Sequence, residues 1–208
     1  MMLKDRIRRG DFVAGVWVKT PHVHVAEVLA LSPLDVLVFD AEHAPFDRTA
    51  LDACILGARA GGKPCLVRPA SADPSQILNA LDCGADGVVI PHVRSAEEAL
   101  SAARAASYAP GGRGYTGGSR AGAWGSKGMA RHRQDAKSVA VIAQIEDVEA
   151  IDAIDDIAAV EAIDALFVGR ADLTISLDAP SSNDPRVVAI AAVSAFASYS
   201  SSSSSSPS

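Results

Sequence analysis

The chain has 208 residues, of which 49% are hydrophobic and 21% are charged, and its formal net charge is −6. These values are typical of one soluble globular domain, and the scattered lysines and arginines argue against a nucleic-acid partner. No apolar run has the length of a membrane span, and no apolar segment follows the charged N-terminus, which argues against a secretory signal. The three cysteines form no CxxC pair, which favours a reduced, cytoplasmic location.

Six short apolar segments are predicted strands, because each is rich in Val, Ile and Leu, nearly continuous, and bounded by Gly, Pro or Asp. They span residues 12–18, 35–40, 64–69, 87–93, 139–146 and 165–172. Amphipathic helices are predicted between them at 24–32, 48–62, 73–85 and 95–109. A repeat of strand and helix at roughly 25 residues per unit predicts an α/β fold with parallel strands. A barrel and a doubly wound sheet both fit this pattern, although no GxGxxG follows the first strand.

Two segments interrupt this repeat. Residues 109–128 form a long glycine-rich stretch, which we expect either to cradle an anion with the help of Arg113 and Arg120 or to act as a mobile lid over the site. Residues 184–198 are predicted to form one more helix, and the serine run that follows is predicted to be disordered. We therefore divide the chain into a domain, 1–198, and a Ser-rich tail, 199–208.

Polar side chains gather where the predicted strands end. The carboxyl ends of parallel strands are where α/β folds bind ligands. The residues at these ends are Asp40, Glu42, His43, Arg68, His92, Gln144, Glu146, Arg170 and Asp172. Their convergence at one edge of the sheet predicts a functional site there.

Glu146 and Asp172 are the candidate metal ligands. Two carboxylates from neighbouring strands, with the other positions left to water or substrate oxygens, suit Mg²⁺ or Mn²⁺. The alternative is that each residue caps the helix that follows. The presence of both beside Gln144 favours the metal.

Arg68 and His43 are candidates for binding and proton transfer. The planar guanidinium of Arg68 suits a substrate carboxylate, and its alternative role is a structural salt bridge across the barrel mouth. His43 suits a general base near neutral pH, if another group orients it. Asp82, on the helix before the fourth strand, could be that group, and so could Asp40 or Glu42, which could instead cap the following turn.

The remaining histidines and the cysteines lack such a context. We expect the histidines to be surface residues or hydrogen-bonded: His22, His24, His92 and His132. We expect the cysteines to lie in the core: Cys54, Cys65 and Cys83. None of the strand ends named above carries a lysine, so a Schiff base is not expected.

Six motifs carry a family resemblance. In order and spacing, they resemble the HpcH/HpaI aldolase family, the metal-dependent (class II) pyruvate aldolases related to the citrate lyase β-subunit, from about Val13 to Asp184. The motifs are FDAEHAP, LVRP, LDCGADGVVIPHV, GGRGYTGGSRA, AQIED and FVGRADLT. The resemblance implies a (β/α)8 TIM barrel of the phosphoenolpyruvate/pyruvate type, here with about six βα units and the last two missing.

The resemblance also implies an activity and its residues. The reaction is reversible cleavage of a 4-hydroxy-2-oxo acid to pyruvate and an aldehyde through a metal-stabilised pyruvate enolate, with Mg²⁺, Mn²⁺ or Co²⁺. By resemblance, Glu146 and Asp172 hold the metal, and His43 transfers a proton with Asp82 as its partner. Substrate contacts are implied for Arg68, Gln144, Gly169 and Ala171. The family further implies a homo-oligomer, in many members a hexamer.

Two other functions remain open at this point. A chain without the last two strands could be a non-catalytic remnant that folds poorly or only with a partner subunit. It could instead be a citrate-lyase-like enzyme that acts on an acyl-CoA, with the glycine-rich loop holding phosphate.

Overall fold

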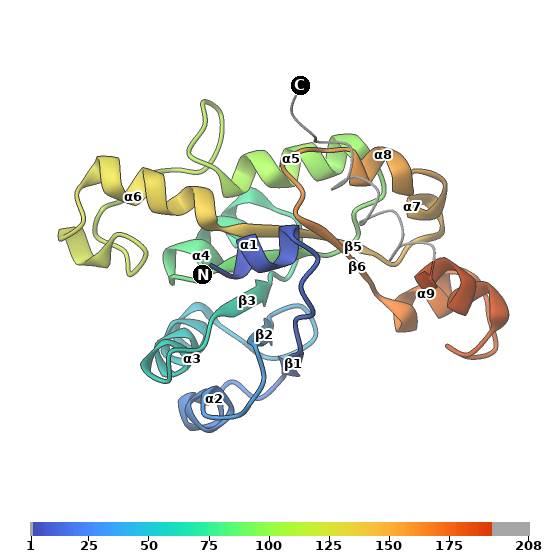
Figure 1. Ribbon diagram of the computed structural model, residues 1–208, viewed down its shortest axis with the longest axis horizontal. Helices are drawn as coiled ribbons and strands as arrows, with labels where there is room; N and C mark the ends of the chain where they lie inside the picture. The colour runs from blue at the N-terminus through green and yellow to red at the C-terminus, as the bar shows by residue number, and fades with distance from the viewer. Residues whose placement is uncertain (1, 193–208) are drawn as a thin grey trace.

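The computed structural model describes residues 2–192. Six strands form one all-parallel sheet in sequence order, and helices cover its outer face (Figure 1). The strands are β1 (Gly15–Val18), β2 (Val36–Asp40), β3 (Cys65–Arg68), β4 (Gly87–Ile90), β5 (Ala140–Ile145) and β6 (Ala165–Val168). The sheet curves into a half-barrel, and the α/β prediction with six parallel strands is confirmed. The expectation that two further units are missing stays a prediction.

The four predicted helices between strands are also present. They are α2 (Val23–Ala30), α3 (Arg48–Ala60), α4 (Pro74–Asp82) and α5 (Ala96–Ala106). The other helices are α1 (Leu3–Arg8), η1 (Ala123–Gly125), α6 (Met129–Asp135), η2 (Ala136–Ser138), α7 (Val148–Asp152), α8 (Ile154–Ala158) and α9 (Arg170–Ser176). Within residues 2–192, no helix is both long and apolar enough to cross a membrane.

The predicted sixth strand was too long at its carboxyl end. β6 stops at Val168, and Gly169 is the N-cap residue of α9. The Gly169 N–H still donates to the Ile145 carbonyl at 3.0 Å, but its own carbonyl accepts the first helical hydrogen bond, from Leu173 at 2.9 Å. Asp172 therefore lies in the first turn of a helix.

The C-terminal prediction is tested only in part. Residues 185–192 are helical, as expected for the beginning of the predicted helix. The rest of that helix and the Ser-rich segment 199–208 lie outside the described residues.

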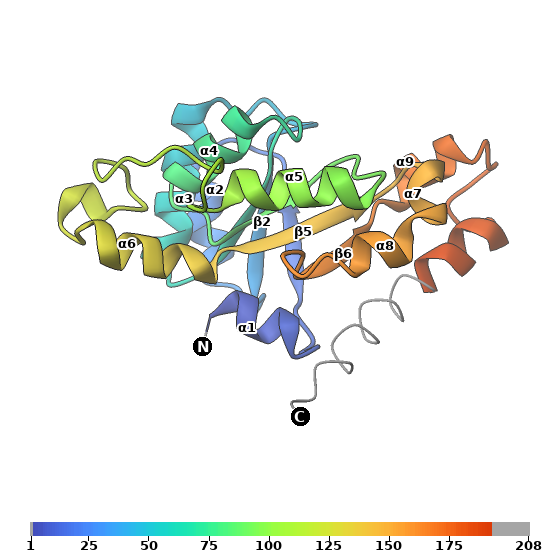
Figure 2. The same cartoon turned by 90° about the horizontal axis from the view of Figure 1, so that it is seen from above.

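Two apolar cores flank the sheet, because alternate side chains of a strand point to opposite faces. One core packs the outer face of the strands against the helices, and it contains Cys54, Cys65 and Cys83 as predicted. The other fills the barrel interior with Leu3, Val36, Val38, Leu66, Val89, Ala140 and Ile142. Helix α1 lies across the amino end of the strands in Figure 2, and its Leu3 belongs to this interior core.

The same alternation aims the polar strand ends inward. Asp40 lies two residues after Val38 and Arg68 two residues after Leu66, so both share the interior face with these residues. Asp40 of β2 and Arg68 of β3 are also direct partners in the register of the two strands. By the same parity, Gln144 of β5 points into the barrel. In β2, β3 and β5 the apolar side chains of the interior thus give way to charged or amide groups near the carboxyl end of the strand.

The glycine-rich stretch is neither a lid nor an anion cradle at the strand ends. It lies beside α4 and α6 at the amino end of the strands (Figures 1 and 2). The Ala121 N–H donates to the Asp82 carbonyl at 3.3 Å, and the Arg120 guanidinium pairs with Asp52 of α3. Arg113 faces Asp82. Both arginines are therefore engaged with helices far from the carboxyl ends of the strands.

Candidate active site

A buried ion pair forms the centre of the site. Arg68 donates from Nε to Asp40 Oδ1 at 2.9 Å and from Nη2 to Oδ2 at 2.8 Å, and Asp40 is fully buried. Burial by itself would raise the pKa of Asp40, but the hydrogen bonds from Arg68 and the His43 N–H hold it at about 2. The Arg68 guanidinium also stacks over the Trp17 ring, with Cζ 4.6 Å from its centroid. The structural salt bridge, the alternative role for Arg68, is therefore present.

This salt bridge does not exhaust the donors of Arg68. A third contact joins Nη1 to Glu42 Oε2 at 3.2 Å. A guanidinium has five N–H groups, so two remain for a ligand carboxylate. Arg68 can act in the structure and in substrate binding at once.

Lys19 is a site residue that the sequence analysis missed. It follows β1 directly, and its Nζ lies 3.3 Å from Asp40 Oδ2. Alternation along the strand is the signal that could have found it, because Lys19 lies two residues after Trp17 and therefore on the same face of the sheet. That face is the interior one, where the Trp17 ring meets Phe167 of β6 at 5.3 Å.

Asp40 caps the turn that carries Glu42 and His43. Its Oδ1 accepts the backbone N–H groups of Glu42 at 3.3 Å and of His43 at 3.1 Å. The His43 ring is half exposed, with Nε2 3.8 Å from Glu42 Oε2. The predicted base is thus at the site, with Glu42 as the carboxylate beside it.

Asp82 is not beside His43, contrary to the expected pair. It is the last residue of α4, and a helix that precedes a parallel strand ends at the amino end of the sheet. Its carboxylate lies 3.5 Å from Arg113 Nη2. Burial raises the pKa of Asp82, and the charge of Arg113 opposes that rise. Within the described chain, His43 and Asp82 belong to opposite ends of the strands.

Glu146 is a buried carboxylate held from two sides. Only 1% of it is exposed. Its Oε1 accepts the His92 backbone N–H at 2.9 Å, and its Oε2 accepts the Gln144 side-chain amide. Burial raises the pKa of Glu146, and the negative charge of Asp172 adds to the rise. A nearby cation would relieve both effects.

Helix capping does not account for this carboxylate pair. The N-cap residue of α7 is Asp147, not Glu146, and Asp172 lies inside α9. Gln144 Oε1 is buried without a hydrogen-bond partner within residues 2–192. A Cβ at Gly169 would stand 2.7 Å from Glu146 Oε2, so only glycine leaves this carboxylate its place.

These residues fit a divalent cation that also binds water or substrate. No three His, Cys, Asp or Glu side chains of the described chain form a group that could hold a metal ion alone. Two carboxylates are enough for Mg²⁺, which commonly keeps several waters. The orphaned Gln144 oxygen and the burial of Glu146, which has no lysine or arginine in ion-pair contact among the described residues, indicate that a positive ligand is suited to this position.

His92 is exposed and hydrogen-bonded, as expected, but it also contacts carboxylates of the site, which the sequence analysis did not assign to it. Its Nδ1 lies 3.0 Å from Asp147 Oδ2, and its Nε2 lies 3.5 Å from Glu42 Oε1. Burial would lower the pKa of His92, but the Asp147 hydrogen bond and the charge of Glu146 raise it above its ordinary value. The signal was its position two residues after β4, among the strand ends.

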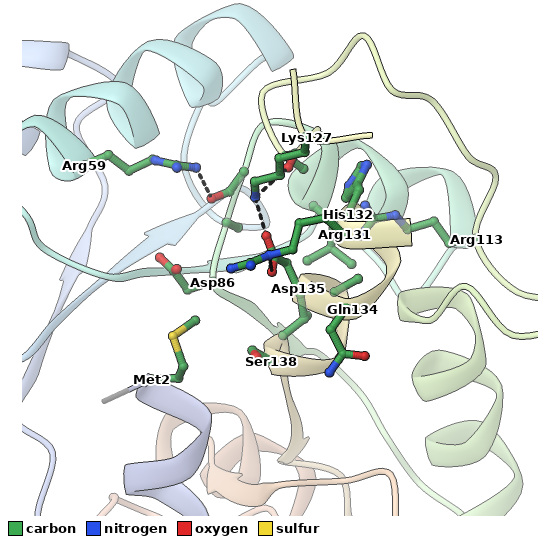
Figure 3. Close-up of a pocket in the computed structure, with 16 residues that line it drawn as sticks. Met2, Arg59, Asp86, Arg113, Lys127, Arg131, His132, Gln134, Asp135 and Ser138 are labelled. Atoms are coloured by element: carbon green, nitrogen blue, oxygen red, sulfur yellow. Dashed lines mark hydrogen bonds and ion pairs between the residues drawn. The ribbon is translucent and has the colours of Figure 1, made fainter. Parts of the chain in front are cut away.

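A separate cavity lies at the opposite end of the strands (Figure 3). Its volume is about 550 Å³, and it lies next to Asp86, which precedes β4, and Val139, which precedes β5. His132 lines it and is buried against Tyr108, so the expectation of a surface or fully hydrogen-bonded histidine was wrong there: its Nδ1 has no partner within residues 2–192. None of the predicted strand-end residues lines this cavity.

Comparison with known proteins identifies the family. The sequence profile described as HpcH/HpaI aldolase/citrate lyase matches residues 13–203. The chain therefore belongs to the HpcH/HpaI aldolase/citrate lyase family, as the six motifs predicted.

Two relatives with assigned activities are aldolases. The chain is 37% identical over 183 residues to a 4-hydroxy-2-oxovalerate aldolase of Rhodococcus jostii (strain RHA1), covering 86% of this chain and 69% of the relative. It is 38% identical over 173 residues to a 4-hydroxy-2-oxovalerate aldolase of Novosphingobium aromaticivorans, covering 82% of this chain and 65% of the relative. The chain thus spans about two thirds of these relatives.

Solved structures of the family share the fold. A HpcH/HpaI aldolase/citrate lyase family protein from Burkholderia cenocepacia J2315 superposes with a TM-score of 0.89 at 32% identity, covering 96% of this chain and 81% of that one. The citrate synthase SbnG superposes with a TM-score of 0.84 at 31% identity, covering 96% of this chain and 78% of that one.

Proposed function

We propose that this chain is a metal-dependent pyruvate aldolase, a carbon–carbon lyase that reversibly cleaves a 4-hydroxy-2-oxo acid to pyruvate and an aldehyde. The carrying observation is an excess of carboxylates at the carboxyl ends of the strands. The acids there are Asp40, Glu42, Glu146, Asp147 and Asp172, and the lysines and arginines in ion-pair contact with them, among the described residues, are Lys19 and Arg68. These carboxylates alone would repel an anionic substrate. The site therefore suits an anion that binds together with a divalent cation.

Glu146 and Asp172 are the proposed ligands of that cation. When bound, it would supply Lewis acidity at the 2-oxo oxygen, where negative charge develops as the carbon–carbon bond breaks. Mg²⁺, Mn²⁺ and Co²⁺ are the candidates.

The other residues bind and orient the substrate. The two free N–H groups of Arg68 would hold the substrate carboxylate, and Gln144 Oε1, which has no hydrogen-bond partner among the described residues, would favour a cation nearby. Gly169 and Ala171, at the beginning of α9, are proposed as backbone contacts to the substrate. The ion pair with Asp40 fixes the Arg68 plane before substrate binds.

His43 is the proposed group for proton transfer. Its ring is half exposed at the mouth of the site, where it can reach the 4-hydroxyl of the substrate directly or through one water. Glu42 is the carboxylate beside it within the chain, with Oε2 3.8 Å from Nε2. We propose that His43 pairs with Asp82 only between two subunits of a homo-oligomer. Light scattering of the purified chain would test whether such an oligomer forms.

Proton NMR of pyruvate in D₂O tests the proposal. With the purified chain and Mg²⁺ or Mn²⁺, we expect loss of the methyl signal as its protons exchange, and we expect EDTA to stop the loss. Exchange indifferent to EDTA would contradict the cation. A soluble chain with a cooperative thermal transition and no exchange would contradict the activity and favour the non-catalytic remnant.

The acyl-CoA alternative loses its structural basis. It relied on the glycine-rich stretch as a phosphate cradle, and that stretch lies at the amino end with Arg120 paired to Asp52. Competition binding separates the two functions, because the pyruvate aldolase predicts that CoA esters do not displace pyruvate.

A further inference from the structure

His92 has a backbone conformation that residues other than glycine rarely adopt. Its φ is 53°, in the left-handed region. Such a conformation costs free energy and persists only where surrounding contacts compensate for it. Here the compensation is visible: the His92 N–H donates to Glu146 Oε1 at 2.9 Å, and the next N–H, of Val93, donates to the Gln144 carbonyl at 3.3 Å. The turn after β4 is thereby attached to the end of β5.

The ring of His92 connects the two halves of the site. Nδ1 lies 3.0 Å from Asp147 Oδ2 and 3.5 Å from Glu146 Oε1, on the β5 side. Nε2 lies 3.5 Å from Glu42 Oε1, on the β2 side, and Glu42 contacts Arg68. One imidazole therefore links Glu146, a carboxylate proposed for the cation, with the arginine proposed for the substrate.

We propose that His92 is the positioning residue of this site, which fixes the Glu146 carboxylate in the orientation that binds a divalent cation and couples it to the Glu42–Arg68 pair. This inference rests on the proposed function. A carboxylate on a flexible side chain binds a cation well only if its rotation is restricted beforehand. Gln144 restricts Oε2 and His92 restricts Oε1, and each oxygen keeps a lone pair for the cation.

Three substitutions separate the backbone of His92 from its ring. His92→Gly keeps the N–H and accepts the left-handed φ but removes the ring. His92→Ala keeps the N–H but disfavours the φ that aims it. His92→Asn keeps a polar side chain on a residue that tolerates this conformation. Ala123→Gly is the matched control, because Ala123 also has a left-handed φ, of 50°, but lies in η1 at the amino end.

The measurement is Mn²⁺ binding to the full chain, detected by the electron paramagnetic resonance signal of the free ion. The thermal midpoint of each variant is measured as well. We expect His92→Ala to weaken Mn²⁺ binding about 10-fold or more, the range found for residues that orient metal ligands. His92→Gly keeps the N–H contact with Glu146 and loses only the ring, so it should weaken binding measurably but less than His92→Ala does. His92→Asn should recover part of this loss. Ala123→Gly should bind Mn²⁺ within about twofold of the wild type, since it does not touch the site.

The outcomes are distinguishable. If both His92→Gly and His92→Ala bind Mn²⁺ as the wild type does, the inference is overturned and the proposed function stands. If the wild type binds no Mn²⁺, the metal-dependent function fails and the inference fails with it. If His92→Ala does not fold, His92→Gly decides, because it has no strain at this position.

Discussion

At the amino end of the strands, two of the basic side chains that line the cavity are paired with a carboxylate of the chain. Lys127 and Arg131 share the carboxylate of Asp135, at 2.8 and 2.7 Å (Figure 3). At the carboxyl end, Glu146 is buried with a raised pKa and has no lysine or arginine in ion-pair contact among the described residues. The cavity at the amino end is therefore not the better candidate for chemistry. Unbalanced buried charge indicates a function more directly than volume does.

The largest expected difference in activity comes from replacing one carboxylate at each end of the strands. Glu146→Gln should reduce metal-dependent exchange of pyruvate about 100-fold or more, because it removes a proposed cation ligand. Asp86→Asn is the matched control at the amino end. Asp86 also has a pKa raised by burial, and it accepts the Cys65 N–H at 2.9 Å. NMR exchange rates of both variants check the prediction, and equal losses would contradict the assignment of the site.

Glu146→Gln should lower the activity of the protein but not its stability. A carboxyl whose folded pKa is raised destabilises the folded state once pH rises above its unfolded pKa. Replacing it by a neutral amide should therefore leave the thermal midpoint at pH 7 unchanged or raise it. A lower midpoint together with lost exchange would mean that the variant simply misfolds.

The second comparison concerns arginine pairs. Arg68→Lys removes the two-pronged contact from fully buried Asp40, and we expect it to cost about 3 kcal/mol of unfolding free energy. Arg120→Lys breaks a similar fork on Asp52, whose side chain is 36% exposed, and should cost less than about 1 kcal/mol. Urea unfolding of both variants measures the difference. Equal costs would contradict the claim that burial sets the strength of the Asp40–Arg68 pair.

The sequence predicted the scaffold well, and the reasons are physical. Continuous apolar strands covered on both faces have a recognisable pattern, and parity then places Asp40, Arg68 and Gln144 at one edge. The position of Asp82 was also accessible, because a helix that precedes a strand ends at the amino end. The role of His92 was not, since it depends on a left-handed backbone and on contacts with residues far along the chain. Whether Asp172 begins a helix or ends a strand depended on one hydrogen bond at Gly169.

Acid should weaken the Asp40–Arg68 ion pair in a defined pH range. Asp40 has a folded pKa of about 2, below the ordinary value near 4, so its contribution is complete above that value and is lost as pH falls toward 2. We expect Asp40→Asn to be less stable than the wild type by about 2 kcal/mol at pH 7. This difference should shrink between pH 4 and about 2 in urea unfolding.

A surface carboxylate gives the control for that pH dependence. The pKa of Asp35 is also lowered, by the hydrogen bond from Arg6 and then by the Ala14 N–H. Asp35→Asn should show the same direction with a smaller amplitude, and added salt should reduce it further because water screens this pair. A pH dependence of Asp40→Asn that is equally sensitive to salt would contradict the buried character of the Asp40–Arg68 pair.

The smallest expected effect comes from one methyl group. In Gly169→Ala, the new Cβ would lie 2.7 Å from Glu146 Oε2 and 3.1 Å from Gln144 Nε2, so the carboxylate must move. The φ of Gly169 is −80°, which alanine adopts without strain, so any effect is steric. We expect pyruvate exchange to fall about 10-fold, equivalent to about 1.4 kcal/mol. Gly114→Ala, whose Cβ would meet nothing within 4 Å, should exchange as the wild type does. If Gly169→Ala keeps full exchange and full Mn²⁺ binding, Glu146 tolerates displacement, and the cation cannot depend on its orientation.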